Sequence, residues 1–169
     1  MGLILAALLV AASPEPLEMG GLLHIGPFSG FGAGVQAGTR ALGVRVSAGW
    51  APLLLAENTG GSVDFKIYSS LQISPDLYAR FIETPTGAAV GAQFGYRYST
   101  VLGHGIGAGG YGQFPINPSL HGLVAGGVLV FPDGESQLKK HESLPSSAQF
   151  SFPGPGLTFG FSLGLAFLP

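Results

Sequence analysis

The stretch Leu157-Thr158-Phe159-Gly160-Phe161-Ser162-Leu163-Gly164-Leu165-Ala166-Phe167 alternates large apolar residues with small or polar ones over its whole length. A period of two residues is typical of a β-strand whose two faces meet different surroundings. A tilted strand needs about 9–11 residues to cross a bilayer, and this stretch is long enough. It therefore predicts a strand with one apolar face that could span a membrane.

The same alternation recurs along the chain. Between residues 41 and 50, for example, Val44, Val46 and Trp50 share one face while Arg45 and Ser47 lie on the other. Residues with turn-forming chemistry, such as Ser74-Pro75-Asp76, separate the alternating runs. The stretch 120–131 is apolar on both faces, so its orientation is left open, and 132–147 is the one long polar connection. We expect about eight strands, at residues 30–38, 41–50, 63–74, 77–82, 87–99, 102–113, 120–131 and 157–167.

The composition indicates which surroundings the apolar face meets. Only 9% of the 169 residues are charged, against roughly 25% in an ordinary soluble domain. The 29 glycines would form a poor solvent-facing strand surface, because glycine weakens a strand and offers no side chain to hydrate. We therefore assign the apolar face to lipid and the small, polar face to the interior of a closed barrel, the only sheet that satisfies its backbone in lipid.

The N-terminus has the layout of a targeting segment. An apolar run from Leu3 to Val10 is followed by small residues and then by the helix-breaking Ser13-Pro14-Glu15-Pro16. This order predicts a signal peptide at residues 1–12, cleaved after Ala12. A short segment, 13–20, follows, and the barrel is expected to occupy 21–169. Cysteine is absent and the net charge is -2, which excludes thiolate chemistry and argues against nucleic acid as a partner.

Aromatic residues near the expected strand ends support a membrane setting. Transmembrane barrels carry belts of aromatic side chains at both edges of their apolar band. Five residues of this chain are placed to form such belts: Trp50, Tyr96, Tyr98, Phe114 and Phe131.

With these features the chain resembles the small eight-stranded outer-membrane β-barrel superfamily, the OmpA/OmpX-like transmembrane domains. The most specific element is the terminal run from Thr158 to Leu165, whose polar, apolar and glycine order is similar to the strand that the outer-membrane assembly machinery reads. The resemblance implies an all-β, antiparallel, up-and-down transmembrane barrel with both termini in the periplasm. It also implies two kinds of partner, outer-membrane lipid and the assembly machinery.

The inward face is expected to carry a polar network. Buried charges must be paired or hydrated, and we predict that the following residues satisfy one another in the lumen: Gln36, Arg45, Asp64, Lys66, Arg80, Gln93 and Arg97. A further hypothesis is that Glu15 and Glu18 neutralise this lumen from the periplasmic end. No metal ligands with zinc-like spacing and no cofactor motif occur.

These expectations give a structural or surface-exposed integral outer-membrane protein without an open pore, since eight strands enclose space for side chains only. Three alternatives remain open: a narrow anion-preferring channel, a lipid A-modifying barrel enzyme, and a soluble glycine-rich surface protein. For the enzyme, Ser119, His121 and Glu142 are the residues to nominate, although no nucleophile-elbow motif is present. We expect no enzymatic activity.

Overall fold

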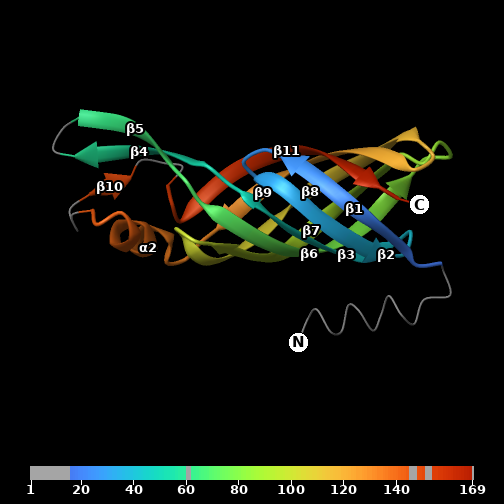
Figure 1. The fold of residues 1–169 in the computed structure, drawn as a ribbon, viewed down its shortest axis with the longest axis horizontal. Coiled ribbons are helices and arrows are strands. Elements are labelled where there is room, and N and C mark those ends of the chain that lie inside the picture. The colour runs from blue at the N-terminus through green and yellow to red at the C-terminus, as the bar shows by residue number, and fades with distance from the viewer. Residues whose placement is uncertain (1–15, 60–61, 145–147, 151–153, 169) are drawn as a thin grey trace.

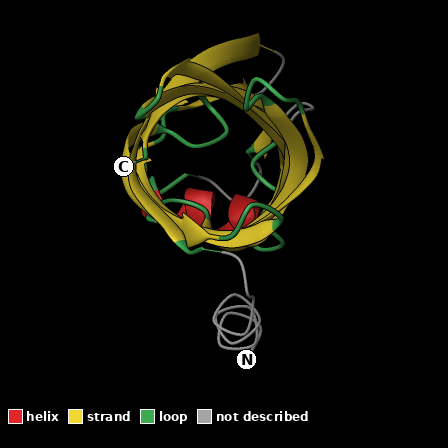
Figure 2. Cartoon of the chain, turned by 90° about the vertical axis from the view of Figure 1, so that its right-hand side faces the viewer, coloured by secondary structure: helices red, strands yellow, loops and turns green. Residues whose placement is uncertain are grey.

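Eight antiparallel strands close into a barrel in the computed structural model, which describes residues 16–59, 62–144, 148–150 and 154–168. The expected fold, a closed antiparallel barrel of eight strands, is thereby confirmed. Figure 2, which looks along the barrel, shows the strands forming a complete ring. The predicted signal peptide, residues 1–12, lies outside the described residues. The barrel strands are β1 (Glu18–Ile25), β2 (Phe31–Gly38), β3 (Leu42–Trp50), β6 (Leu71–Glu83), β7 (Ala89–Ser99), β8 (Gly103–Asn117), β9 (Leu120–Val130) and β11 (Leu157–Phe167).

The barrel closes where its first strand meets its last. β1 pairs with β11 in antiparallel register from Gly21–Phe167 to Ile25–Leu163. This seam is much shorter than the ladder between β11 and β9, which runs from Leu157–Val130 to Phe167–Leu120. Because β1 and β11 are antiparallel, the start of β1 and the end of β11 lie at the same end of the barrel, here called the terminal end (Figure 1).

β1 was not expected as a strand, and the barrel begins before residue 21. Its outward residues Met19, Leu23 and Ile25 are exposed, whereas Leu22 points inward and is buried. The alternation is therefore present, but the pair Gly20-Gly21 interrupts it in the sequence. Glu18 to Gly20, assigned above to a short N-terminal segment, already pair with β2.

The stretch 63–74, predicted as one barrel strand, divides between two sheets. β4 (Leu53–Thr59) and β5 (Ser62–Tyr68) continue the β3–β6 hairpin beyond the barrel. They form a second, three-stranded sheet with β10 (Gln149–Phe150), in the order β10–β4–β5. Figure 1 shows this sheet extending past the end of the barrel that lies opposite the terminal end and is here called the cap end.

The predicted turn at Ser74-Pro75-Asp76 is instead the middle of β6, a strand of 13 residues. Proline is normally confined to edge strands because it cannot donate a ladder hydrogen bond. Pro75 pairs with Val46 on the β3 side. On the β7 side no residues pair between Ile73–Tyr98 and Asp76–Gly95, although the register is the same on both sides of this gap. The missing donor therefore faces β7, where the ladder has a gap.

The connection expected as a polar loop contains a helix, α2 (Gly134–His141). Glu135 lies in its first turn and three basic residues lie in its last, an order that suits the helix dipole. Leu138, on its inner side, is fully buried. α2 lies at the cap end, where Figure 2 shows it behind the lower part of the ring of strands.

An apolar cluster fills the cap end beneath α2. It brings together residues from the strands, the hairpin and the helix: Phe28, Leu55, Tyr68, Val101, Leu102, Leu129, Phe131 and Leu138. The sequence position of Phe131 had suggested an aromatic belt, but the structure places this residue in the core. Trp50, Tyr96 and Tyr98 do lie exposed at the cap end of their strands, and Phe114 is exposed toward the terminal end.

The cluster also explains why β9 is apolar on both faces. Its register with β11 places Val124, Val128 and Val130 beside outward residues of that strand. Leu129 points inward and joins the cap cluster, while Leu123 packs against a smaller cluster of Leu22, Ala166 and Leu168 near the terminal end.

Among the described residues, no helix is long and apolar enough to cross a membrane.

Candidate functional site: the polar interior of the barrel

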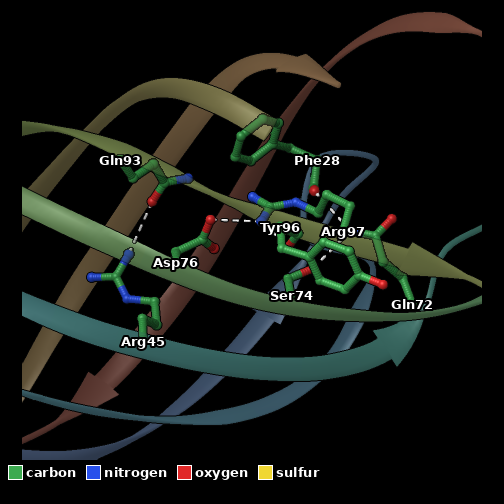
Figure 3. A network of polar contacts seen from close by, with 8 residues as sticks. All are labelled: Phe28, Arg45, Gln72, Ser74, Asp76, Gln93, Tyr96 and Arg97. Atoms are coloured by element: carbon green, nitrogen blue, oxygen red, sulfur yellow. Dashed lines mark hydrogen bonds and ion pairs between the residues drawn. The ribbon is translucent and has the colours of Figure 1, made fainter. Parts of the chain in front are cut away.

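An ion pair between β6 and β7 lies at the centre of the interior. Arg97 Nη1 is 2.6 Å from Asp76 Oδ1, and the two side chains are 1% and 6% exposed. Figure 3 shows both pointing into the barrel, with Phe28 beside the guanidinium, whose carbon lies 5.3 Å from the ring centre. A buried charge needs a partner of this kind, because leaving either ion alone would cost several kcal/mol.

Arg97 also compensates for Pro75. The register of β6 and β7 places Pro75 opposite Tyr96, and proline has no N–H to offer the Tyr96 carbonyl. Arg97 Nη1 donates to this carbonyl instead, at 3.0 Å. One side chain thus neutralises Asp76 and satisfies the backbone group that the neighbouring proline leaves unpaired.

Two glycines make room for this pair. A Cβ at Gly107 would lie 2.9 Å from three atoms of the Arg97 guanidinium group. A Cβ at Gly95 would lie 2.3 Å from Asp76 Oδ1. Both contacts are too close for any side chain, so the inward glycines of β7 and β8 provide the volume that the polar side chains occupy.

Arg45, on β3, is held by neutral groups. Its Nη1 donates to Gln93 Oε1 at 3.1 Å, and its Nη2 donates to Gln36 Oε1 at 3.2 Å. The guanidinium carbon lies 5.0 Å from the Tyr78 ring centre and 5.2 Å from that of Tyr111, within the range of cation–π attraction. Among the described residues Arg45 has no carboxylate within ion-pair distance.

Arg80 lies on β6, as Asp76 does, and faces a cavity at the terminal end. The cavity has a volume of about 430 Å³ and is lined by Glu18, Gln113 and His121 among others. Arg80 Nη2 is 3.5 Å from Glu18 Oε2, and the Arg80 side chain is only 8% exposed. The Glu18 contact agrees with the hypothesis that acidic residues neutralise the lumen from this end. Glu15, the other residue of that hypothesis, lies outside the described residues.

A much smaller cavity, of about 30 Å³, lies in the middle of the barrel, lined by Arg45, Asp76 and Gln93 among others. This volume corresponds to roughly one or two water molecules. Polar side chains therefore occupy most of the section of the barrel at this level.

Two of the predicted lumen residues, Asp64 and Lys66, lie outside the barrel, because β5 belongs to the hairpin sheet. Lys66 Nζ is 2.7 Å from Glu57 Oε2, and Tyr68 donates to the same oxygen at 2.9 Å. The Lys66 and Tyr68 contacts lower the pKa of Glu57, and the pKa of Lys66 is raised in return. Burial, together with the Glu57 contact, raises the pKa of Tyr68 to about 12.

The other five predicted residues, Gln36, Arg45, Arg80, Gln93 and Arg97, do lie inside the barrel. Sequence reasoning missed Asp76, which had been assigned to a turn. Asp76, Tyr78 and Arg80 alternate with Leu77 and Ala79. That pattern would have placed Asp76 in the strand predicted at 77–82 if Pro75 had not been taken as part of a turn.

The three residues nominated for an enzyme are not brought together. Ser119 and His121 lie at the terminal end, where β8 turns into β9. Glu142 follows α2 at the cap end and contacts His141. Within the described ranges, no three His, Asp or Glu side chains gather as metal ligands would.

No protein-family model, curated protein or solved structure matches this chain.

Proposed function

We propose that this protein is an integral outer-membrane barrel with a structural or surface role. One observation carries the proposal: every one of the eight barrel strands exposes a large apolar side chain while the interior holds the charges. These outward residues include Leu23, Val35, Val46, Ile73, Phe94, Ile106, Val124 and Phe161. A barrel in water would have the opposite arrangement, because large exposed apolar surfaces promote association.

The size of the apolar wall supports the same proposal. β11 alternates from Leu157 to Phe167, and ten steps of about 3.4 Å at a tilt of about 40° span roughly 26 Å. The apolar band of an outer-membrane barrel is about 25 Å tall. In this setting both termini are periplasmic, the cap end faces outward, and the C-terminal strand is the segment available to the assembly machinery.

The packed interior favours a closed barrel over a channel. The Arg97–Asp76 pair links β6 with β7, the Arg45 network links β3 with β2 and β7 inside the barrel, and the cap cluster lies at one mouth. A narrow anion-preferring channel is the second candidate, supported by Arg45, a buried cation that has no carboxylate within ion-pair distance among the described residues. Single-channel recording in planar bilayers separates them: steps of anion-selective current would favour the channel, and their absence the closed barrel.

The first test of membrane insertion is gel migration of protein from washed outer membranes, with and without boiling. We expect the unheated protein to migrate faster, since a folded membrane barrel resists the detergent. A soluble protein that shows no shift would contradict the proposal.

A matched pair of substitutions tests which surface meets lipid. Phe161 is 64% exposed on the barrel wall and Phe65 is 74% exposed on the hairpin beyond it. Phe161→Arg should destabilise the protein in bilayers by about 2–4 kcal/mol, the cost of a charge at mid-membrane. Phe65→Arg should have little effect. Equal tolerance of both changes in unfolding titrations would contradict a lipid-facing wall.

A further inference from the structure

We propose that the cavity at the terminal end is a binding site for a small oxyanion, a phosphate or carboxylate group, with Arg80 as its principal ligand. The inference depends on the interior of the barrel and not on the barrel's location, so it can be tested in detergent. It goes beyond the proposed structural role because it assigns a ligand class to this end.

The charges of the interior give the first argument. Three guanidinium groups, those of Arg45, Arg80 and Arg97, face two carboxylates, those of Glu18 and Asp76. Arginine stays protonated in proteins, so the excess positive charge cannot be removed by titration. Asp76 is committed to Arg97 at 2.6 Å. The remaining positive potential is therefore associated with Arg45 and Arg80, and a low-dielectric wall strengthens it.

The polar atoms of the cavity give the second argument. Arg80 Nε and His121 Nδ1 are buried without a hydrogen-bond partner in the described part of the chain, and Arg80 Nη2 has only the 3.5 Å contact with Glu18. Arg80 and His121 both line the 430 Å³ cavity. Buried polar groups are nearly always satisfied in folded proteins, and an oxyanion could accept hydrogen bonds from the guanidinium and the imidazole together.

Glu18 now occupies part of this position. Its carboxylate contacts Arg80 through one oxygen at 3.5 Å, and its side chain is 37% exposed. That geometry is weak compared with the bidentate contact of about 2.8 Å that a free oxyanion makes with arginine. Glu18 is therefore a displaceable competitor, and an oxyanion that enters the cavity would replace it.

Calorimetric titration of the purified, folded full chain in detergent tests the site, with inorganic phosphate as the first probe and dihexanoyl phosphatidate as the second. Saturable binding of phosphate would identify a free oxyanion as the ligand. Binding of the phosphatidate alone would identify a lipid headgroup. If neither probe binds, the proposal is wrong.

Substitutions locate the binding and test the competition. Arg80→Gln should weaken it by about tenfold or more, as expected for the loss of a charged hydrogen-bond donor. Arg40→Gln, at the exposed rim of the same cavity, should change it less than about twofold. Glu18→Gln should tighten it by roughly two- to fivefold, and this variant keeps the test decisive if Arg80→Gln does not fold. Unchanged or weaker binding in Glu18→Gln would overturn the proposal.

Discussion

At the cap end of the barrel, Phe131 and Leu138 lie in an apolar cluster that closes the mouth, whereas at the terminal end Arg80 and Glu18 face a cavity of about 430 Å³. The cap end uses residues from two long excursions, the β4–β5 hairpin and the segment with α2. The terminal end has short turns, at residues 39–41, 84–88 and 118–119. The long connections at the cap end therefore provide the apolar residues of the cluster. The terminal end has only short turns, and its cavity stays polar and accessible.

The largest effect is expected between the two ends, at the Arg97–Asp76 pair. Asp76→Ala should destabilise the protein by about 3–5 kcal/mol, because it leaves a buried guanidinium without its carboxylate. Denaturant unfolding, followed by the gel shift of the folded form, measures the change. Asp64→Ala, on the exposed hairpin, is the control and should be nearly neutral. A loss below about 1 kcal/mol in Asp76→Ala would mean that water reaches Arg97.

The apolar closure of the cap end can be broken at α2. Leu138→Ala should cost about 2–5 kcal/mol through lost burial and the cavity that remains. It should also speed amide hydrogen exchange in α2 and β10. Leu17→Ala, an exposed residue of the terminal end, is the control. Equal effects of the two substitutions would show that the ends do not differ in packing.

The cap end should lose stability at high pH. The pKa of Tyr68 is raised from 10.0 to about 12, because burial and the Glu57 carboxylate favour the neutral phenol. A raised pKa in the folded state gives a stabilising contribution that is complete below the unfolded pKa. It is lost as the pH rises from about 10 to about 12. Tyr68→Phe should reduce the loss of stability between about pH 10 and pH 12 in unfolding experiments, and an unreduced loss would assign it to other groups.

The smallest effect is expected at the terminal end. Arg40 Nη2 and Glu83 Oε1 are 3.5 Å apart, with the Arg40 side chain 69% exposed. Glu83→Gln should change the unfolding free energy by less than about 1 kcal/mol, as is usual for exposed ion pairs. Raising the ionic strength should remove the difference from the unsubstituted protein. An effect above 2 kcal/mol would place this pair in a more buried setting than the structure indicates.

The sequence predicted the barrel because period-two alternation is a local signal, clearest in β11, β7 and β3. It failed where a local rule was overridden by distant contacts. Pro75 indicates a turn by itself, and only Arg97 on the next strand makes a proline acceptable there. Likewise, nothing in residues 63–68 distinguishes a hairpin strand from a barrel strand, because the apolar outward face of Phe65 and Ile67 continues that of Leu71 and Ile73.

For the candidate site, five of the seven residues predicted for the lumen from residue type and face do lie inside the barrel. Their pairing was not predictable, since it depends on register between strands. Glu57, at the cap end, shows the limit most clearly. Its buried carboxylate is stabilised by Lys66 and Tyr68 across the hairpin, and no sequence pattern marks a glutamate in an exposed hairpin as buried.

The seam between β1 and β11 makes the closed ring depend on both ends of the described chain. The first described strand and the last must meet before the ring is complete, although nearly the whole chain separates them in sequence. A nascent chain lacking residues 157–167 would present two unpaired edges, one on β1 and one on β9. Closure of the ring therefore requires the C-terminal strand, and without it the other seven strands could form only an open sheet.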